Sequence, residues 1–299
     1  MKKVAVTGLS GVIGQVFGYF MPNTYTFVDL FNSRKYSGPL NIHSHIKLDL
    51  LDKNKIAKVL NQVDPDIIIH MASVTHIDQC EEDKKNKKHG TVWRTNVTAT
   101  QEIAKYSAKH KNHFVFLSTE CVFSGKKEYY NERSKKDPIN WYGYTKHMAE
   151  EAIIKSGAPA AIIRAVVAYH ENDLGKTIYG KILNSLLSEP EVFAVADQFF
   201  TPTYTYDIIR AIKKIMKKEH TGIFHVAPDK SISPYDFARI VAKKNKISVK
   251  KIKKTTLKEF YSKEKAALRL LHSSLESTYS NKLLKIRPKS PQKNLLNKI

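Results

Sequence analysis

A tyrosine and a lysine stand four residues apart in Tyr142-Gly143-Tyr144-Thr145-Lys146, where a helix is expected to begin. Residues at this spacing share one face of a helix, so the phenol and the ammonium can point to a common place. A phenol, with a pKa of about 10, is a poor acid or base at neutral pH, and a nearby cation favours its ionised form. The pair therefore predicts proton exchange with a bound molecule, with the pKa of Tyr142 lowered by Lys146.

Three glycines follow the first short apolar run in Thr7-Gly8-Leu9-Ser10-Gly11-Val12-Ile13-Gly14. Between a strand and a helix, such a turn lets backbone amides approach a pyrophosphate, and the last glycine lets the helix pack closely on the strand. The turn therefore predicts a bound dinucleotide.

Two hydroxyl residues, Ser118 and Thr119, end a later apolar run at 114–117. Open α/β sheets bind ligands at the carboxyl ends of their strands. We expect a hydroxyl there to hold a substrate carbonyl while Tyr142 protonates the forming alkoxide. Lys146 is expected to contact the nicotinamide ribose, and Asn96 to anchor a water molecule in a proton relay.

Acidic residues end the second and third apolar runs. Asp29 can accept hydrogen bonds from an adenosine ribose, which would favour NAD, or can simply form a turn. Arg34 and Lys35 follow and can accommodate a 2′-phosphate, which would favour NADP. Asp49 can reach the adenine edge or cap the helix expected near Asp52. These residues leave the coenzyme open.

The elements that position these groups alternate along the first half of the chain, as in a parallel sheet covered on both faces. We predict an α/β, Rossmann-type doubly wound parallel sheet. The expected strands are 4–6, 25–28, 46–48, 67–69, 114–117 and 161–163, and the expected helices are 12–21, 54–63, 92–109 and 142–156, with a long loop at 126–140.

The alternation of strands and helices breaks after about residue 165, which predicts a second, smaller part. We assign residues 1–165 to an NAD(P)-binding Rossmann domain, to which 200–228 return. Residues 166–199 and 229–299 are assigned to a C-terminal substrate-binding subdomain and tail.

The chain has 299 residues and a formal net charge of +22, with lysines spread over most of its length. Clusters at 84–88 and 250–254 lack interleaved aromatic residues, so no specific nucleic-acid partner is predicted. Two cysteines without metal-ligand spacing predict neither a disulfide framework nor a metal site. No long apolar run and no signal-peptide pattern occurs, which predicts a cytoplasmic protein without a membrane span.

The chain resembles the extended short-chain dehydrogenase/reductase family over most of its length. The shared motifs are the glycine turn, Pro65-Asp66-Ile67-Ile68-Ile69-His70-Met71-Ala72-Ser73, Asn96, Ser118-Thr119 and Tyr142-x-x-x-Lys146. Within that family it is most similar to the dTDP-4-dehydrorhamnose reductases and the regulatory subunits of methionine adenosyltransferase. The segments that carry this similarity are Ile77-Asp78-Gln79-Cys80-Glu81, Ser118-Thr119-Glu120-Cys121-Val122-Phe123-Ser124-Gly125, Gln198-Phe199-Phe200-Thr201-Pro202-Thr203 and Gly222-Ile223-Phe224-His225-Val226-Ala227.

The resemblance implies a catalytic triad and a coenzyme, NADP or NAD, with NADPH favoured for a biosynthetic reductase. The expected site residues fall into three groups. Catalytic residues are Thr119, Tyr142 and Lys146; coenzyme-binding residues are Gly8, Ser10, Gly11, Val12, Ile13, Gly14, Asp29, Asp49, Leu50, Met71, Ala72, Ser73, Asn96, Tyr142 and Lys146; substrate-binding residues are Ser118, Glu120, Val122, Phe123, Val167 and Gln198.

The predicted function is NAD(P)H-dependent reduction of a nucleotide-linked 4-keto-6-deoxy sugar, and a homodimer is one assembly considered for the enzyme. Glu120, Cys121 and Val167 stand where the rhamnose reductases usually have aspartate, tyrosine and tryptophan. These departures lie on the sugar side, so the reaction class is better indicated than the sugar. One alternative is a sugar-nucleotide epimerase or epimerase/reductase, with Cys121 and His170 as candidate acid/base residues. The other is a non-catalytic, cofactor-binding regulatory subunit.

Overall fold

The computed structural model describes residues 1–172 and 175–296, which form two compact units. Unit 1 consists of Met1–Val122, Asn140–Arg164 and Ile209–Phe224, and unit 2 contains the other described residues. One boundary lies next to residue 165, where the sequence placed its division. Residues 123–139, 200–208 and 225–228, which the sequence analysis kept with the first domain, belong to unit 2.

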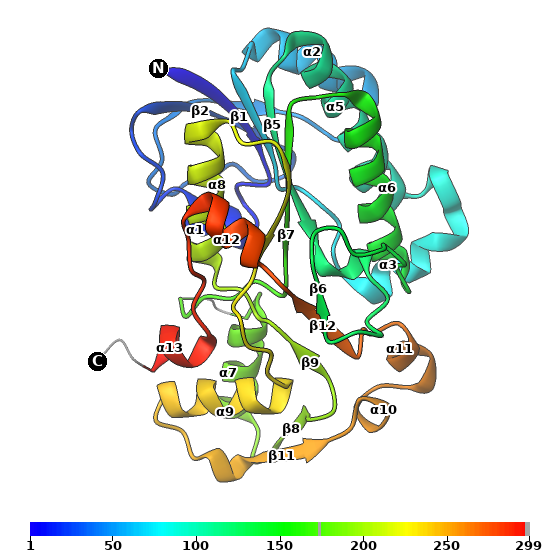
Figure 1. Ribbon diagram of the computed structural model, residues 1–299, viewed down its shortest axis with the longest axis vertical. Coiled ribbons are helices and arrows are strands. Elements are labelled where there is room, and N and C mark those ends of the chain that lie inside the picture. Colours follow the sequence, from blue (N-terminus) through cyan, green and yellow to red (C-terminus); the bar gives the residue numbers. More distant parts are fainter. Residues whose placement is uncertain (173–174, 297–299) are drawn as a thin grey trace. The chain divides into compact units, whose positions relative to one another are not determined.

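A seven-stranded sheet in the order β10-β7-β5-β4-β1-β2-β3 organises unit 1. The pairs β1 with β2, β2 with β3, β1 with β4 and β4 with β5 are parallel. Strand order reverses beside β1, which is the topology of a doubly wound Rossmann sheet. Figure 1 shows α2, α5 and α6 along one face of this sheet and α1 and α8 along the other. The predicted fold class is confirmed.

The elements of this sheet follow the predicted alternation, with additional short helices. The strands are β1 (Lys2–Thr7), β2 (Tyr25–Phe31), β3 (Ile42–Lys47), β4 (Ile67–His70), β5 (His113–Thr119), β7 (Ala160–Ala165) and β10 (Gly222–Val226). The helices are α1 (Val12–Phe17), α2 (Lys53–Val63), α3 (Ile77–Asp83), η1 (Lys84–His89), α4 (Thr91–Trp93), η2 (Arg94–Thr98), α5 (Ala99–His110), η3 (Glu120–Val122), α6 (Trp141–Ser156) and α8 (Thr205–Lys218).

The apolar pattern of the sequence explains why these segments pack as they do. Every residue of β4 is buried, as expected of a central parallel strand covered on both faces. Helix α2 buries Ile56, Val59, Leu60 and Val63, a stripe with the spacing of one helical face. This stripe joins a core that also contains residues of β4, β5, α5 and α6.

Unit 2 contains small sheets and short helices. Its sheets have the orders β11-β8 and β6-β12-β9. The strands are β6 (Tyr129–Tyr130), β8 (Val192–Val195), β9 (Phe199–Phe200), β11 (Ile252–Thr255) and β12 (His272–Leu275). The helices are α7 (Ile178–Ser188), α9 (Pro234–Lys244), η4 (Val249–Lys251), α10 (Leu257–Phe260), α11 (Lys263–Ala267), α12 (Thr278–Leu284) and α13 (Pro291–Leu295).

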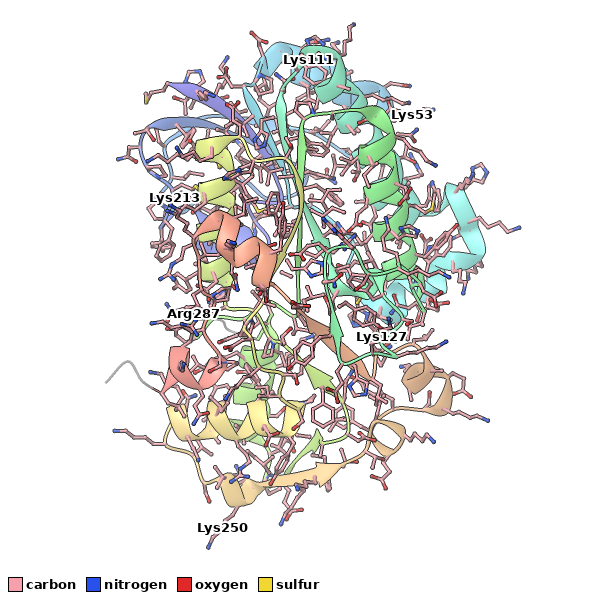
Figure 2. The ribbon with its side chains drawn as sticks, in the orientation of Figure 1. Lys53, Lys111, Lys127, Lys213, Lys250 and Arg287 are labelled. Atoms are coloured by element: carbon pink, nitrogen blue, oxygen red, sulfur yellow. The ribbon has the colours of Figure 1, made fainter. Side chains whose placement is uncertain are left out.

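The lysines of unit 1 are spread over separate parts of its surface. Figure 2 shows Lys53 on α2, Lys111 after α5 and Lys213 on α8 at three different places, and all three side chains are exposed. A binding site for nucleic acid typically gathers such charges on one face or along one helix. The distribution fits a generally positive surface.

A buried ion pair ties α6 to β7 and to the end of β5. The Arg164 guanidinium donates to both Glu150 carboxylate oxygens, at 2.9 and 2.6 Å, and both side chains are almost fully buried. The Ser118 hydroxyl donates to the same carboxylate at 2.6 Å. Because Ser118 directly precedes Thr119, the network fixes α6 against the sheet next to Thr119.

Replacing Glu150 with leucine should lower the free energy of unfolding by about 3–5 kcal/mol, because it leaves a buried guanidinium without its carboxylate. Urea denaturation followed by circular dichroism measures this loss. The control is Glu102→Gln, which removes a surface pair with Lys105 and should cost about 0–1 kcal/mol. Equal losses in the two variants would contradict the structural role given to Glu150.

Candidate functional site

The glycine turn brings the backbone of β1 close to that of β4. Gly8 has φ +83°, and a Cβ there would lie 2.5 Å from the amide nitrogen of Ala72. A Cβ on Gly14 would lie 2.4 Å from Cα of Leu9, in the same turn. At Gly11, by contrast, the nearest atom is the Gly8 carbonyl oxygen at 3.1 Å, and Gly11 itself is exposed. Two glycines are thus required by packing, whereas the third keeps the turn open.

A pocket of about 450 Å³ lies beside this turn, at the carboxyl ends of β1, β2, β3 and β4. It has the size and position expected for part of a dinucleotide site. The residues that line it are Gly8, Leu9, Ser10, Asp29, Leu30, Phe31, Asn32, Ser33, Leu48, Asp49, Leu50, Leu51, Ala72, Ser73, Val74, Thr91 and Thr95.

Seven of the expected coenzyme-binding residues line this pocket, and the others lie elsewhere in unit 1. Those in the wall are Gly8, Ser10, Asp29, Asp49, Leu50, Ala72 and Ser73; those outside it are Gly11, Val12, Ile13, Gly14, Met71, Asn96, Tyr142 and Lys146. The sequence analysis missed several wall residues, among them Phe31, Asn32, Ser33 and Val74. Their position directly after buried strands was the signal that could have identified them.

Asp29 lies in the wall, but one of its oxygens is already bound within the protein. Oδ2 accepts from the backbone amide of Tyr36 at 2.8 Å and lies 2.9 Å from Nδ1 of His45. The side chain is nearly fully buried. A ribose would therefore meet a carboxylate that also holds the loop after β2.

Charged side chains near Asp29 and the glycine turn form hydrogen bonds with neighbouring backbone groups. Arg34, after β2, donates to the Ser10 carbonyl at 2.7 Å, so its guanidinium reaches the glycine turn. Asp49 accepts from the Leu51 amide at 2.9 Å. Asp52 is the N-cap residue of α2, and its side chain makes no capping hydrogen bond. Asp49 thus shapes the turn before α2 and also forms part of the wall.

Asn96 holds the loop that forms one wall of the pocket, and it uses every hydrogen-bonding position of its side-chain amide. Its oxygen accepts from the Ser73 hydroxyl at 3.0 Å and from the Val74 amide at 2.9 Å. Its nitrogen donates to the Val74 carbonyl at 2.9 Å and to the Thr145 hydroxyl at 3.1 Å. An amide side chain offers two acceptor and two donor positions, so none is left for the expected relay water. Asn96 instead fixes the loop after β4 to α6.

Thr119 and Tyr142 are brought together where β5 ends and α6 begins. Helix α6 starts after Asn140, whose side chain accepts from the Gly143 amide at 2.8 Å. This cap fixes the first turn, which carries Tyr142, and the Tyr142 phenol is hydrogen-bonded to Thr119. The Thr119 hydroxyl donates to Oε2 of Glu120 at 2.7 Å and accepts from the Cys121 amide at 3.2 Å.

Lys146 lies one helical turn after Tyr142 and is buried. Its Nζ donates to the Leu117 carbonyl at 2.7 Å and lies 3.9 Å from the centre of the Phe116 ring. Burial lowers the pKa of Lys146 to about 7, although the Glu150 carboxylate acts in the opposite direction. The ammonium therefore loses much of its preference for the charged state and stays within reach of the end of β5.

The predicted lowering of the pKa of Tyr142 is wrong. Burial raises the pKa of this phenol well above its ordinary value, and the neighbouring Cys121 and Glu120 raise it further, while the Thr119 hydrogen bond lowers it. Lys146 does not reverse this shift, since its ammonium is bound to the backbone of β5. Tyr142 is therefore fully protonated at neutral pH and suited to donate a proton.

The expected substrate residues occupy both units and differ in exposure. In unit 1, Ser118 is committed to the Glu150 network, and Glu120 and Val122 are buried. In unit 2, Phe123 stacks on Tyr130 with ring centres 4.4 Å apart. The other two expected substrate-binding residues in unit 2 are Gln198 and Val167. Gln198 donates to the Leu270 carbonyl at 2.7 Å, whereas Val167 is exposed and has φ +29°.

The expected role of Ser118 in substrate binding does not fit its contacts. Its hydroxyl donates to a buried carboxylate, so it is part of the packing between β5 and α6. At Val167 the backbone conformation is costly for a β-branched side chain. Such strain is more common at binding sites than elsewhere, which fits the expected position of Val167 on the sugar side.

In the described ranges 1–172 and 175–296, no three His, Cys, Asp or Glu side chains are grouped as metal ligands. Across those ranges, too, none of the helices combines the length and apolar character needed to cross a membrane.

A family model described as RmlD substrate binding domain matches residues 1–299. The chain belongs to this family. The resemblance inferred from the motifs is thus confirmed. Proteins named dTDP-4-dehydrorhamnose reductase occur both among the similar sequences and among the similar solved structures.

Among curated proteins, the RmlD-family chain is 28% identical over 258 residues to the spore coat polysaccharide biosynthesis protein SpsK of Bacillus subtilis, covering 86% of this chain and 84% of SpsK. It is 27% identical over 245 residues to a dTDP-4-dehydrorhamnose reductase of Aggregatibacter actinomycetemcomitans, covering 80% and 77%. Methionine adenosyltransferase 2 subunit beta of Danio rerio is 24% identical, covering 81% and 73%.

Among solved structures, dTDP-4-dehydrorhamnose reductase from Bacillus anthracis in complex with NADP superposes with a TM-score of 0.84. The alignment covers 99% of this chain and 98% of that one, at 23% identity. At this identity the likeness concerns the fold, which the two proteins share over nearly their whole lengths.

The two glycine positions with different surroundings give a test of the pocket. Gly11→Ala should leave the thermal unfolding temperature close to that of the unaltered protein, since its Cβ meets only one atom at 3.1 Å, but should weaken dinucleotide binding at least about tenfold by obstructing the turn. Gly14→Ala should lower the unfolding temperature, because its Cβ collides with backbone. Calorimetric titration with NADP and NAD, together with thermal unfolding, measures both. Unchanged binding in Gly11→Ala would place the dinucleotide elsewhere.

Proposed function

We propose that this protein is an NAD(P)H-dependent reductase of a nucleotide-linked 4-keto-6-deoxy sugar. The observation that carries the proposal is the hydrogen bond between a protonated Tyr142 and Thr119, in the same unit as the glycine turn and its pocket. The 27% identical relative named dTDP-4-dehydrorhamnose reductase supports the same reaction class. The packing of Gly8 against Ala72 supports dinucleotide binding, because a side chain there would close the turn.

The residues present suit the protonation step of a ketone reduction, in which the alkoxide formed by hydride transfer receives a proton. A bound nicotinamide coenzyme supplies the hydride. The Thr119 hydroxyl, expected from the sequence to hold the keto oxygen, already donates to Glu120, so its part is to position the Tyr142 phenol at the end of β5. Tyr142, whose raised pKa keeps it protonated, donates a proton to the alkoxide that forms. Lys146, held against β5 by its bond to the Leu117 carbonyl, would hold the ribose of the coenzyme through its nitrogen.

Replacing Tyr142 with phenylalanine should lower the turnover number by about 10²–10⁴-fold with little change in coenzyme affinity, because it removes the proton donor and leaves the pocket intact. NADPH oxidation with a panel of 4-keto nucleotide sugars measures this effect. Tyr144→Phe is the matched control, since Tyr144 lies on the same helix, is exposed and stacks on Trp141. Equal turnover in both variants would contradict the role of Tyr142.

The coenzyme proposed is NADPH in preference to NADH. One oxygen of Asp29 already accepts from the Tyr36 amide and lies near His45, so it is less able to accept hydrogen bonds from the ribose hydroxyls of NADH. Asn32 and Ser33 line the same end of the pocket, and Arg34 follows them with its guanidinium at the glycine turn. A 2′-phosphate would meet these donors and a positive charge.

Arg34→Ala should raise the Michaelis constant for NADPH about five- to twentyfold and leave that for NADH nearly unchanged, because it removes a charge that meets a phosphate found in one coenzyme alone. Steady-state kinetics with both coenzymes measures the ratio. Lys213→Ala, on the exposed face of α8, controls for the general loss of positive charge. Equal changes for NADH and NADPH would contradict phosphate recognition by Arg34.

An epimerase needs an additional acid/base pair on opposite faces of the sugar ring. Cys121, one of the two candidates, is buried beside Glu120, with 3.8 Å between Sγ and Oε1. His170 lies in unit 2 and is also buried. Incorporation of solvent deuterium at C3 or C5 of the sugar would support this alternative.

A regulatory subunit without turnover is the alternative suggested by the methionine adenosyltransferase relative. The joined Thr119 and Tyr142, with Lys146 one turn away, favour a reductase. A homodimer and a cytoplasmic location stay predictions from the sequence.

A further inference from the structure

Glu120 is a buried carboxyl group that follows Thr119 directly and is bound to it. The Thr119 hydroxyl donates to Oε2 at 2.7 Å, and the Cys121 thiol donates to Oε1 at 3.8 Å. A hydroxyl has one proton to donate. Thr119 donates this proton to Glu120 in the structure, and it can donate it to the phenolate once Tyr142 is ionised, which is why its bond to Tyr142 lowers the pKa of the phenol. The three groups thus form a chain of hydrogen bonds from the phenol to the carboxyl.

Each turnover of the proposed reaction removes one proton from Tyr142, so a second group has to restore it. The amide of Asn96, where a relay water was expected, is fully occupied by Ser73, Val74 and Thr145. Lys146 donates to the Leu117 carbonyl. The contacts of Tyr142 lead instead through Thr119 to Glu120.

We propose that Glu120 returns a proton to Tyr142 through the Thr119 hydroxyl after each reduction. This inference rests on the proposed reductase function. Once Tyr142 is a phenolate, the Thr119 hydroxyl turns from Glu120 to donate to it and accepts from the protonated Glu120 carboxyl. The proton on Oγ1 passes to the phenolate, while the carboxyl O–H bond of Glu120 breaks and its proton passes to Oγ1. Glu120 is left as a carboxylate and regains a proton from water as the product leaves. No oxidant or reductant is needed.

Burial supports this direction of transfer. It raises the pKa of Glu120 from an ordinary 4.5 to about 7, although the hydrogen bonds from Thr119 and Cys121 act against the shift. The pKa of Tyr142 is raised much further, so a proton on Glu120 moves readily to a Tyr142 phenolate. Cys80 of α3 also acts on Tyr142, and burial raises the pKa of its thiol to about 12, which keeps it neutral.

The first experiment needs neither coenzyme nor substrate. It compares the free energy of unfolding of the unaltered protein and of Glu120→Gln across pH. A folded-state pKa above the unfolded one gives a contribution that is complete below pH 4.5 and is lost as the pH rises through about 7. The stability difference between the two proteins should therefore fall across that range. A constant difference would overturn the proposal, because a carboxyl of ordinary acidity holds no proton at neutral pH.

The second experiment separates the first turnover from later ones. In Glu120→Gln, Tyr142 still carries its first proton, so one equivalent of NADPH per site should be oxidised at the normal rate. Later turnovers should slow at least about tenfold, which gives a burst that the unaltered protein lacks. Glu120→Asp keeps a carboxyl group and should recover most of the steady rate, whereas Glu102→Gln makes the same chemical change on the surface and should have no effect.

The outcomes distinguish the two proposals. If the unaltered protein oxidises no NADPH with any 4-keto nucleotide sugar, the proposed function fails and the relay fails with it. If it turns over and Glu120→Gln slows the first and later turnovers equally, or slows neither, the relay alone is wrong. The same conclusion follows if Glu120→Asp is as slow as Glu120→Gln.

Discussion

The Asn96 amide joins segments that are distant in the sequence. It binds the loop after β4 through Ser73 and Val74, and it binds α6 through Thr145. That loop forms one wall of the dinucleotide pocket, while α6 carries Tyr142 and Lys146. A buried amide with all four positions satisfied is costly to rearrange, because each lost partner leaves a polar group unpaired. The distance between pocket and phenol therefore depends on this side chain.

Burial also determines the protonation of the groups that converge on the end of β5. It raises the pKa of Tyr142 and Glu120 and lowers that of Lys146, so each group is shifted toward its neutral form. Such an arrangement costs stability compared with apolar residues, and perturbed groups of this kind are common at active sites. The network of Ser118, Glu150 and Arg164 fixes α6 to the sheet next to these groups.

The fold and the placing of the main groups were predictable from the sequence because parallel strands impose them. Apolar runs alternating with amphipathic helices require a covered sheet, and residues that follow the runs must meet at its carboxyl edge. This argument placed Gly8, Asp29, Ala72 and Thr119 at one edge.

The partners of the polar side chains were not predictable in the same way. His45 approaches Asp29 from the next strand, and Thr145 meets Asn96 from a helix almost fifty residues later. Periodicity carries no information on such pairs. The pKa of Tyr142 was misjudged for a related reason, since sequence spacing shows the nearby lysine but does not show that the lysine is buried and that the half-buried phenol is removed from water.

Transfer of deuterium from NADPH labelled at C4 of the nicotinamide tests the central claim most directly. After reaction with a dTDP-linked 4-keto-6-deoxy sugar, magnetic resonance of the sugar product should show one deuterium at C4 and a hydroxyl proton that exchanges with water. With both hydrogens at C4 of the nicotinamide labelled, a sugar product without deuterium, or with deuterium at another sugar carbon, would contradict reduction at C4 beside Thr119 and Tyr142.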